Sequence, residues 1–321
     1  MSFQFDQFLT EHQEINTVGI AGHISPDGDC IGSCTGLYLY LKKNYPQFRV
    51  DIFMEKVPEE LRILKGTEDI RTSFTSDVER YDVFFILDTI KERTNAAEKL
   101  FDKAALRVNF DHHVSNKGTD GICFIVPEAS STCEVLCMAL DYDKMDLDIA
   151  RNIYSGIVTD TGMFHYSSTS PATMRAAAKL MEFGFDHSDL IEQVELAKRF
   201  SQNKAMGAML AKASLELDGK VITSFCSTDE MHDLGFVSED FEGVVSQMNL
   251  TVGVECAVFA HGTEDGDVRM NLRSKGKVNV SEIAVSVGGG GHVRASGCTM
   301  HNMTCEESIS LILDKIKEQL N

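Results

Sequence analysis

The sequence predicts an α/β protein in which a mostly parallel sheet with helices on both faces precedes a smaller C-terminal α/β domain. The first half alternates short apolar runs with helical patterns, and runs that are apolar throughout are typical of parallel strands covered on both faces. The second half changes pattern, with three strand-like runs and two helices. A length of 321 residues is enough for two domains.

The first half supplies five predicted strands and the helices between them. Residues 3–14 are predicted to form an amphipathic helix in which Phe3, Phe5, Phe8 and Leu9 can share one face. The predicted strands are 17–21, 49–54, 82–87, 105–110 and 121–126. The main predicted helices are 30–41, 130–140, 146–158, a helix that Ser170 caps and Gly184 ends, and 186–200.

The second half has predicted strands at 220–225, 254–260 and 267–273, with helices at 239–248 and 304–320. The last helix opens with a capping box made by Thr304 and Glu307. A weakly amphipathic stretch rich in small residues precedes these elements. We therefore expect a catalytic domain at 1–185, a helical connector at 186–215 and a substrate-binding domain at 216–321.

Composition narrows the functional classes. The formal net charge is −19, which argues against a protein that wraps duplex DNA on a basic face. Nine cysteines without a C-x-x-C motif indicate reduced thiols in a cytoplasmic protein. Residues 1–14 lack the pattern of a signal peptide, and no apolar run is long enough to span a membrane. The expected location is the cytoplasm.

Polar residues follow three of the predicted strands at the point where each strand ends. Parallel strands place these ends on one edge of the sheet, so the side chains converge in one crevice. Nitrogen and oxygen donors packed this closely suit a hard or borderline divalent metal. A polar turn whose carboxylates cap the next helix is the alternative for the first group. The residues are His23, Asp27 and Asp29, then Asp88, then Asp111, His112 and His113, with Asp160 at the end of a later helix.

These motifs, in this order, resemble the DHH phosphoesterase superfamily. The run from Gly288 to Gly297, with four consecutive glycines, resembles its DHH-associated C-terminal domain. The compact two-domain layout is similar to the bifunctional oligoribonucleases (nanoRNases) and 3′-phosphoadenosine-5′-phosphate phosphatases. The resemblance implies an exonuclease and phosphatase, similar to the 3′(2′),5′-bisphosphate nucleotidases. Its substrates would be short RNAs, linear dinucleotides and the 3′-phosphate of 3′-phosphoadenosine 5′-phosphate.

The resemblance also implies two divalent ions, most suitably Mn²⁺, with Mg²⁺ or Co²⁺ able to substitute. One ion would be held by His23, Asp27 and Asp88, and the other by Asp29, Asp88, His112 and Asp160, so that Asp88 bridges them. A hydroxide shared by the ions would attack phosphorus. Asp111 would orient a ligating histidine, and His113 would support the site or contact the phosphate. The predicted catalytic residues are Asp88, Asp111, His112 and His113.

Substrate binding is assigned by the same resemblance to the second domain. Consecutive glycines at Gly289, Gly290 and Gly291 let backbone N–H groups approach a phosphate. Arg273 and Arg294 suit phosphate contact, and the remaining predicted residues are Ser274, His292 and Ser296. We expect the active site in the cleft between the domains and a preference for RNA of two to five nucleotides. A flexible glycine loop and a solvated strand end are the non-functional alternatives.

Three other functions share these motifs. The same ligands would serve a phosphodiesterase for cyclic or linear dinucleotide messengers, or an inorganic pyrophosphatase or exopolyphosphatase-like enzyme. A non-enzymatic nucleotide-binding protein is less favoured, because all six predicted metal ligands are present. The expected partners are short oligonucleotides and nucleotide bisphosphates, without duplex DNA or membrane, and a homodimer is left open.

Overall fold

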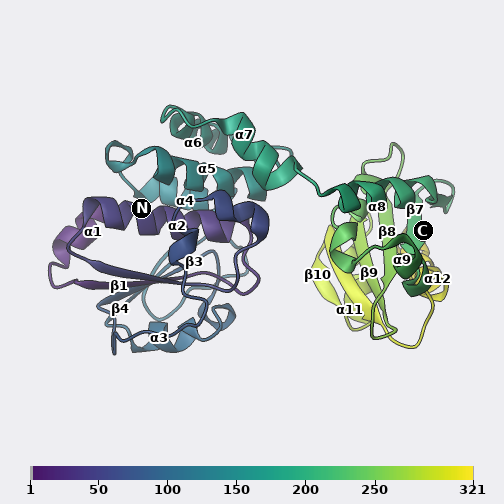
Figure 1. Cartoon of the computed structure of the whole chain (residues 1–321), viewed down its shortest axis with the longest axis horizontal. Helices are drawn as coiled ribbons and strands as arrows, with labels where there is room; N and C mark the ends of the chain where they lie inside the picture. Colours follow the sequence, from purple (N-terminus) through teal and green to yellow (C-terminus); the bar gives the residue numbers. More distant parts are fainter. Residues whose placement is uncertain (1–2, 321) are drawn as a thin grey trace. The chain divides into compact units, whose positions relative to one another are not determined.

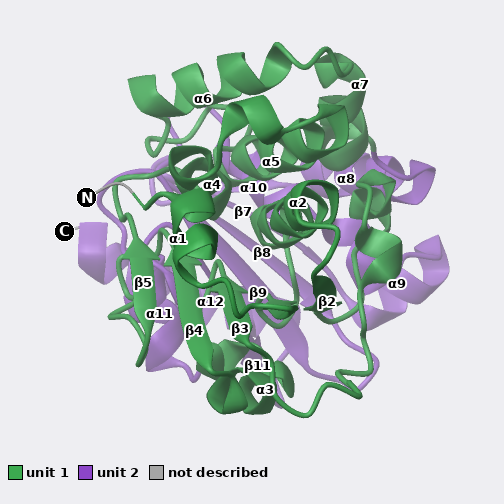
Figure 2. Ribbon diagram, turned by 90° about the vertical axis from the view of Figure 1, so that its left-hand side faces the viewer, with its two compact units in different colours: residues 1–197 green, residues 198–321 purple. Residues whose placement is uncertain are grey.

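The computed structural model describes residues 3–320. The chain divides into two compact units, residues 1–197 and 198–321, which Figure 2 colours separately. The boundary falls inside the stretch predicted as a connector. Within residues 3–320, no helix combines the length and apolar character needed to cross a bilayer.

The first unit contains a five-stranded sheet in the order β2-β1-β3-β4-β5, and every neighbouring pair is parallel. This confirms the predicted parallel sheet. All five predicted strands are present, each within one or two residues of its expected bounds. They are β1 Thr17–Ala21, β2 Arg49–Phe53, β3 Val83–Leu87, β4 Leu106–Asp111 and β5 Ile122–Ile125.

Helices cover both faces of this sheet (Figure 1). Helix α3 (Ala97–Lys103) lies on one face, where Phe84 and Phe101 belong to a small apolar cluster. The larger core lies on the other face, under α1, α2, α4 and α5. These helices are α1 Phe5–Glu11, α2 Gly28–Asn44, α4 Thr132–Ala139 and α5 Leu147–Asp160, followed by α6 Pro171–Met181 and α7 His187–Ile191.

The strand order reverses between β1 and β3. After β1 the chain crosses to β2 on one side, and it later returns to place β3 on the other side. In open parallel sheets this reversal leaves a crevice at the carboxyl ends of the two strands, where ligands bind. The residues that follow β1, β3 and β4 therefore stand at the position that the topology favours for a site.

Helices α2 and α5 pack unusually closely through glycines spaced four residues apart. A Cβ atom on Gly28 would lie 2.2 Å from Thr159 Oγ1, one on Gly32 would lie 2.6 Å from the Asn152 carbonyl, and one on Gly36 would lie 2.7 Å from the Ile153 side chain. This close approach brings the first turn of α2 next to the last turn of α5.

The second unit is built on a mixed six-stranded sheet in the order β10-β11-β9-β8-β7-β6, where only the β7–β8 pair is parallel. Its strands are β6 Ser214–Glu216, β7 Val221–Cys226, β8 Cys256–Gly262, β9 Val268–Ser274, β10 Gly290–His292 and β11 Ala295–Met300. Its helices are α8 Phe200–Ala211, α9 Thr228–Leu234, α10 Val244–Asn249, α11 Val280–Ser286 and α12 Cys305–Leu320.

Two predicted helices are interrupted. The predicted helix at 239–248 is a 3₁₀ turn followed by α10, because Gly243 adopts a left-handed φ of +82° between them. The predicted helix at 186–200 consists of α7 and a π-helical turn over Glu192–Leu196, after which Ala197 is extended. Strands β6, β10 and β11 and helices α9 and α11 were not predicted.

Candidate metal centre

The predicted residues of the first unit meet at one edge of its sheet. His23 lies two residues beyond β1, Asp88 directly follows β3, and Asp111 is the last residue of β4. These three strands are neighbours in the sheet. Asp27 and Asp29 stand at the start of α2, and Asp160 is the last residue of α5. The sheet edge and the two closely packed helices thus supply all the predicted metal ligands.

Asp88 lies at the centre of this group and is 2% exposed. Its Oδ2 is 3.4 Å from His23 Nε2, whereas its Oδ1 is 3.6 Å from both His112 Nε2 and His113 Nδ1. Asp88 has a left-handed φ of +61°, which is uncommon and strained for a residue other than glycine. One buried carboxylate therefore faces two separate sets of donors.

On the His23 side of Asp88, two carboxylates face the same imidazole nitrogen. The His23 Nδ1 lies 2.8 Å from the Ile24 carbonyl oxygen, which favours the tautomer with its proton on Nδ1. Its Nε2 then faces Asp88 and also Asp27 Oδ1, at 3.5 Å. Asp27 additionally caps α2, since its Oδ1 accepts a hydrogen bond from the Cys30 amide. The capping alternative and the ligand prediction for Asp27 are thus compatible.

The His112 side carries three carboxylates. The His112 Nε2 lies 3.3 Å from Asp160 Oδ2, 3.6 Å from Asp88 Oδ1 and 3.9 Å from Asp29 Oδ2. Asp160 lies at the C-terminal end of a helix, where the helix dipole disfavours a negative charge. A cation at this position would remove that unfavourable interaction.

Asp29 is held by the N-terminus of α4. The Thr132 amide donates to Asp29 Oδ2 at 2.6 Å, and the Cys133 amide donates to Asp29 Oδ1 at 2.9 Å. The Thr132 hydroxyl donates to Asp88 Oδ1 at 3.1 Å. Buried Glu134 fixes this helix start, because its Oε2 accepts hydrogen bonds from the Ser130 amide and hydroxyl. Sequence reasoning missed these supporting residues.

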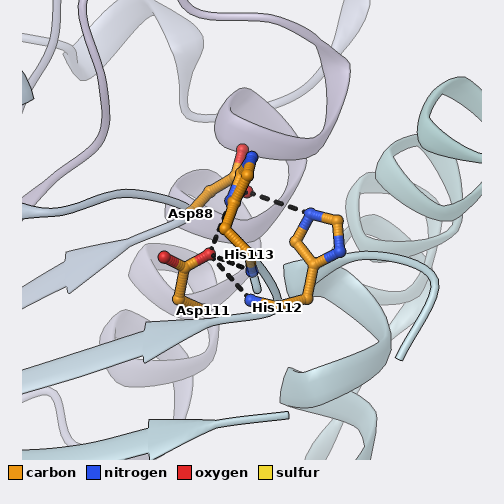
Figure 3. Close-up of side chains that lie close together, drawn as sticks. All are labelled: Asp88, Asp111, His112 and His113. Carbon is orange, nitrogen blue, oxygen red and sulfur yellow. Dashed lines mark hydrogen bonds and ion pairs between the residues drawn. The ribbon is translucent and has the colours of Figure 1, made fainter. Parts of the chain in front are cut away.

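Asp111 orients His113 rather than the ring of His112. The Asp111 Oδ1 lies 2.8 Å from His113 Nδ1 and accepts hydrogen bonds from the amides of His112 and His113, as Figure 3 shows. Its other oxygen accepts from Asn116 at 2.5 Å. The hydrogen bond between the His113 ring and Asp111 raises the pKa of His113. Asp111 therefore holds the ring of His113, which we predicted to support the site or contact the phosphate, and does not hold the ring of the predicted ligand His112.

The charges of this group are unfavourable without a cation. Burial raises the pKa of Asp29 well above its usual range, and the charges of Asp88 and Asp160 raise it further. Burial, together with Asp88 and Asp27, raises the pKa of Asp160 to about 8, although 32% of its side chain is exposed. Burial lowers the pKa of His23, but its hydrogen bonds to Asp27 and Asp88 outweigh this effect and raise it.

The donor set fits divalent metal ions. Three overlapping groups each bring one donor atom per residue within 4.8 Å of the others: Asp88 with Asp111, His112 and His113; His23 with Cys30 and Asp88; and Asp29 with His112 and Asp160. Carboxylates that resist ionising together gain most from positive charge. Imidazole and carboxylate donors together suit borderline divalent ions. Cys30 is an additional neighbour, although burial raises the pKa of its thiol well above normal.

The raised carboxyl pKa values predict a pH-dependent stability for the metal-free protein. Asp29 and Asp160 bind protons more tightly in the folded chain than in the unfolded chain, so stability falls as pH rises from about 4 towards 8. We expect the melting temperature of EDTA-treated protein to fall as pH rises across this window. The fall should be larger than that of protein in saturating Mg²⁺. If the melting temperature changed with pH by the same amount with and without Mg²⁺, the charge assignment would be contradicted.

Gly156 is the residue of α5 that lets this helix approach Asp29, and it offers a test of the packing. A Cβ atom there would lie 2.4 Å from Cys133 Sγ and 2.9 Å from Asp29 Oδ1. We expect Gly156→Ala to destabilise the protein by about 1–3 kcal/mol through overpacking, and to weaken metal binding. The matched control is Gly207→Ala in α8, where no atom lies within 4 Å of the added carbon. Equal unfolding free energies for both variants would refute this account.

Five of the eight predicted substrate residues of the second unit line a groove of about 620 Å³ on its sheet. Arg273, the three glycines at 289–291 and Ser296 line it, as do Arg269 and Asn271. His292 and Arg294 are exposed but lie outside this lining. Ser274 is buried outside it, where its hydroxyl donates to the Val278 carbonyl. Ser274 therefore holds the following loop.

Comparison with known proteins supports this organisation. The DHH family, N-terminal domain, matches residues 17–157, and the DHHA1 domain matches residues 218–321. The bifunctional oligoribonuclease and PAP phosphatase NrnA of Thermus thermophilus is 27% identical over 303 residues, covering 94% of this chain and 89% of the relative.

Two further relatives extend the comparison. A crystal structure of an exopolyphosphatase-related protein from Bacteroides fragilis superposes with a TM-score of 0.88 and 26% identity, covering 98% of this chain and 95% of that one. The cyclic-di-AMP phosphodiesterase GdpP of Geobacillus thermodenitrificans is 24% identical over 329 residues. That match covers 95% of this chain but only 48% of the relative.

Proposed function

Because this chain belongs to the DHH family and carries both the DHH N-terminal domain and the DHHA1 domain, we propose that it hydrolyses short oligoribonucleotides, linear dinucleotides and the 3′-phosphate of 3′-phosphoadenosine 5′-phosphate. Family membership makes it a metal-dependent hydrolase of phosphoester bonds. Support for the substrates comes from the relative named bifunctional oligoribonuclease and PAP phosphatase, which matches along nearly the whole chain.

The position of Asp88 is the observation that carries this proposal. One of its oxygens faces His23, and the other faces His112. A carboxylate placed between two donor sets suits a pair of ions about 3.5–4 Å apart. In the proposed arrangement, His23, Asp27 and Asp88 hold one ion, and Asp29, Asp88, His112 and Asp160 hold the other. Mn²⁺ is the proposed ion.

Two bound ions would supply a nucleophilic water of lowered pKa and would stabilise the charge that develops on the phosphate oxygens. The chain's own residues prepare the site for this reaction. The Thr132 and Cys133 amides fix Asp29, and the Ile24 carbonyl orients His23. In the proposal, His113, held by Asp111, contacts the phosphate that reacts.

The groove of the second unit is proposed to bind the rest of the substrate. Arg273 suits bidentate contact with a phosphate, and the backbone of Gly289–Gly291 can approach it closely. His292 and Arg294 are proposed to contact substrate from the neighbouring β10–β11 hairpin. The location of the active site in a cleft between the domains stays a prediction.

The test is hydrolysis of a substrate panel with Mn²⁺, comparing a diribonucleotide, 3′-phosphoadenosine 5′-phosphate, cyclic di-AMP and pyrophosphate. We expect the first two to be cleaved with the highest kcat/KM. Faster cleavage of cyclic di-AMP would favour the dinucleotide-messenger alternative, which the similarity to GdpP makes the next candidate. Hydrolysis of pyrophosphate alone would overturn the substrate assignment, and cleavage of none would refute the enzymatic proposal.

RNA length gives a separate prediction. We expect RNA of two to five nucleotides to be hydrolysed at least about tenfold more efficiently than a twenty-nucleotide RNA, because a groove of about 620 Å³ holds only a few nucleotides and a longer strand needs an open exit from it. Both are measured as kcat/KM per 5′ end at equal Mn²⁺ concentration. The length prediction is wrong if the long RNA is cleaved as fast as the dinucleotide.

A further inference from the structure

Exposed apolar side chains border the metal centre along the chain. Ile24 follows His23 and is 39% exposed, and Val114 follows His113 and is 72% exposed. Met163 and Tyr166, which come shortly after Asp160, are 40% and 58% exposed. A site for inorganic pyrophosphate needs polar and charged surroundings only. An apolar margin next to carboxylates and imidazoles instead fits a phosphoester that carries a group with an apolar face.

The segment after Asp160 has an unusual backbone. Gly162, Met163 and Phe164 all have left-handed φ values, of +53°, +58° and +65°. Two of them carry side chains, so the conformation is strained and persists only because its surroundings fix it. The Met163 amide donates to the Val158 carbonyl, and the ring of Phe164 packs against Tyr154 with centroids 6.2 Å apart.

This turn places Tyr166 over the backbone next to Asp160. The Tyr166 amide donates to the Thr161 carbonyl at 2.9 Å. A Cβ atom built on Gly162 would lie 2.5 Å from Cζ of the Tyr166 ring, so the ring rests directly on the Gly162 backbone. More than half of the side chain nevertheless remains exposed. The ring is thus supported by the fold without being enclosed by it.

We propose that Tyr166 is a stacking surface for a nucleobase of the substrate, with Met163 extending its apolar margin. The inference rests on the proposed function and assigns the residue that selects nucleosides over inorganic phosphates. Aromatic rings bind bases through their faces with little dependence on base identity. A ring fixed beforehand loses little conformational freedom on binding, which favours it as such a surface. Tyr166 is therefore a specificity residue for ligands that contain a base.

Kinetics with a matched pair of substrates test this role. We expect Tyr166→Ala to raise KM for a diribonucleotide by roughly 5- to 100-fold, the range that base stacking supplies, with a smaller effect on kcat. Tyr166→Phe keeps the ring and should retain wild-type KM. For a dinucleotide made abasic at the stacked position, wild type and Tyr166→Ala should have equal KM. If Tyr166→Ala has the wild-type KM for the intact diribonucleotide, the proposal fails.

A binding experiment separates this proposal from the catalytic one. The sequence contains seven tyrosines but no tryptophan, so Tyr166→Trp introduces a single tryptophan at the proposed surface, which can be excited selectively over the remaining tyrosines. With Mg²⁺ present, AMP should quench its fluorescence and ribose 5-phosphate should not. Leu147→Trp is the control, because Leu147 is exposed at the opposite end of α5, about 20 Å along the helix from Asp160.

The outcomes of the two experiments are distinct. Equal quenching by AMP and ribose 5-phosphate, or equal quenching of the Tyr166→Trp and Leu147→Trp variants by AMP, would overturn the stacking surface whatever the enzyme hydrolyses. If no phosphoester were cleaved but AMP still quenched Tyr166→Trp selectively, the base site would stand and the proposed function would fail.

Discussion

Asp88→Asn is expected to lower kcat by about 1,000-fold or more, on the order of 4 kcal/mol of transition-state stabilisation. The substitution keeps the size of the side chain but removes the charge that faces both His23 and His112. An amide is a poor bridging ligand for two divalent ions, so the substitution would weaken binding at both proposed metal positions. The measurement is kcat on a diribonucleotide at saturating Mn²⁺, with calorimetric titration of Mn²⁺ binding.

A matched control comes from the other end of the same strand. Asp82 precedes β3 as Asp88 follows it, and its carboxylate accepts hydrogen bonds from the amides of Asn16 and Thr17. Asp82→Asn removes the same charge, and we expect it to lower stability slightly while leaving kcat within about twofold of wild type. Activity within tenfold of wild type in a folded Asp88→Asn variant would remove Asp88 from the catalytic machinery.

Removal of divalent ions has the second large expected effect. We expect exhaustive treatment with EDTA to reduce the rate of diribonucleotide hydrolysis by more than about 1,000-fold, because the ions would supply both the activated water and the stabilisation of charge on the phosphate. Adding Mn²⁺ should restore the rate. The ions bind only the folded chain, so they should also raise the melting temperature, by an amount that grows with the logarithm of the free concentration.

Comparing variants tests whether the ions bind at Asp88. Asp88→Asn should have a much smaller rise of melting temperature with Mn²⁺, whereas Asp82→Asn should respond as the wild type does. EDTA-treated enzyme that keeps its full rate, with no metal detected by elemental analysis, would contradict the metal-dependent mechanism.

The first unit was predictable because its strands are marked by composition. Runs such as Val83–Leu87 are apolar throughout, which identified buried parallel strands and their order along the chain. The second unit was less predictable. Strand β10 consists of Gly290, Gly291 and His292, so it has no apolar pattern, and it is defined by antiparallel pairing with β11. The break at Gly243 depends on a left-handed conformation that one glycine in a helical pattern does not reveal.

The metal centre likewise has a part that the sequence predicts and a part that it does not. Polar residues at the ends of parallel strands predicted that His23, Asp88 and His112 would converge, since topology alone places those ends together. The supports of the site come from tertiary contacts between residues far apart in the chain. The Thr132 amide meets the Asp29 carboxylate across 103 positions, and no local pattern indicates that contact.

The most direct test is a crystal structure of the protein grown with Mn²⁺, with anomalous diffraction recorded on both sides of the manganese absorption edge. We predict two anomalous peaks about 3.5–4 Å apart, with one oxygen of Asp88 bound to each ion or one oxygen shared between them. A single peak away from Asp88, or no peak among His23, His112 and Asp160 at saturating Mn²⁺, would contradict the two-metal centre.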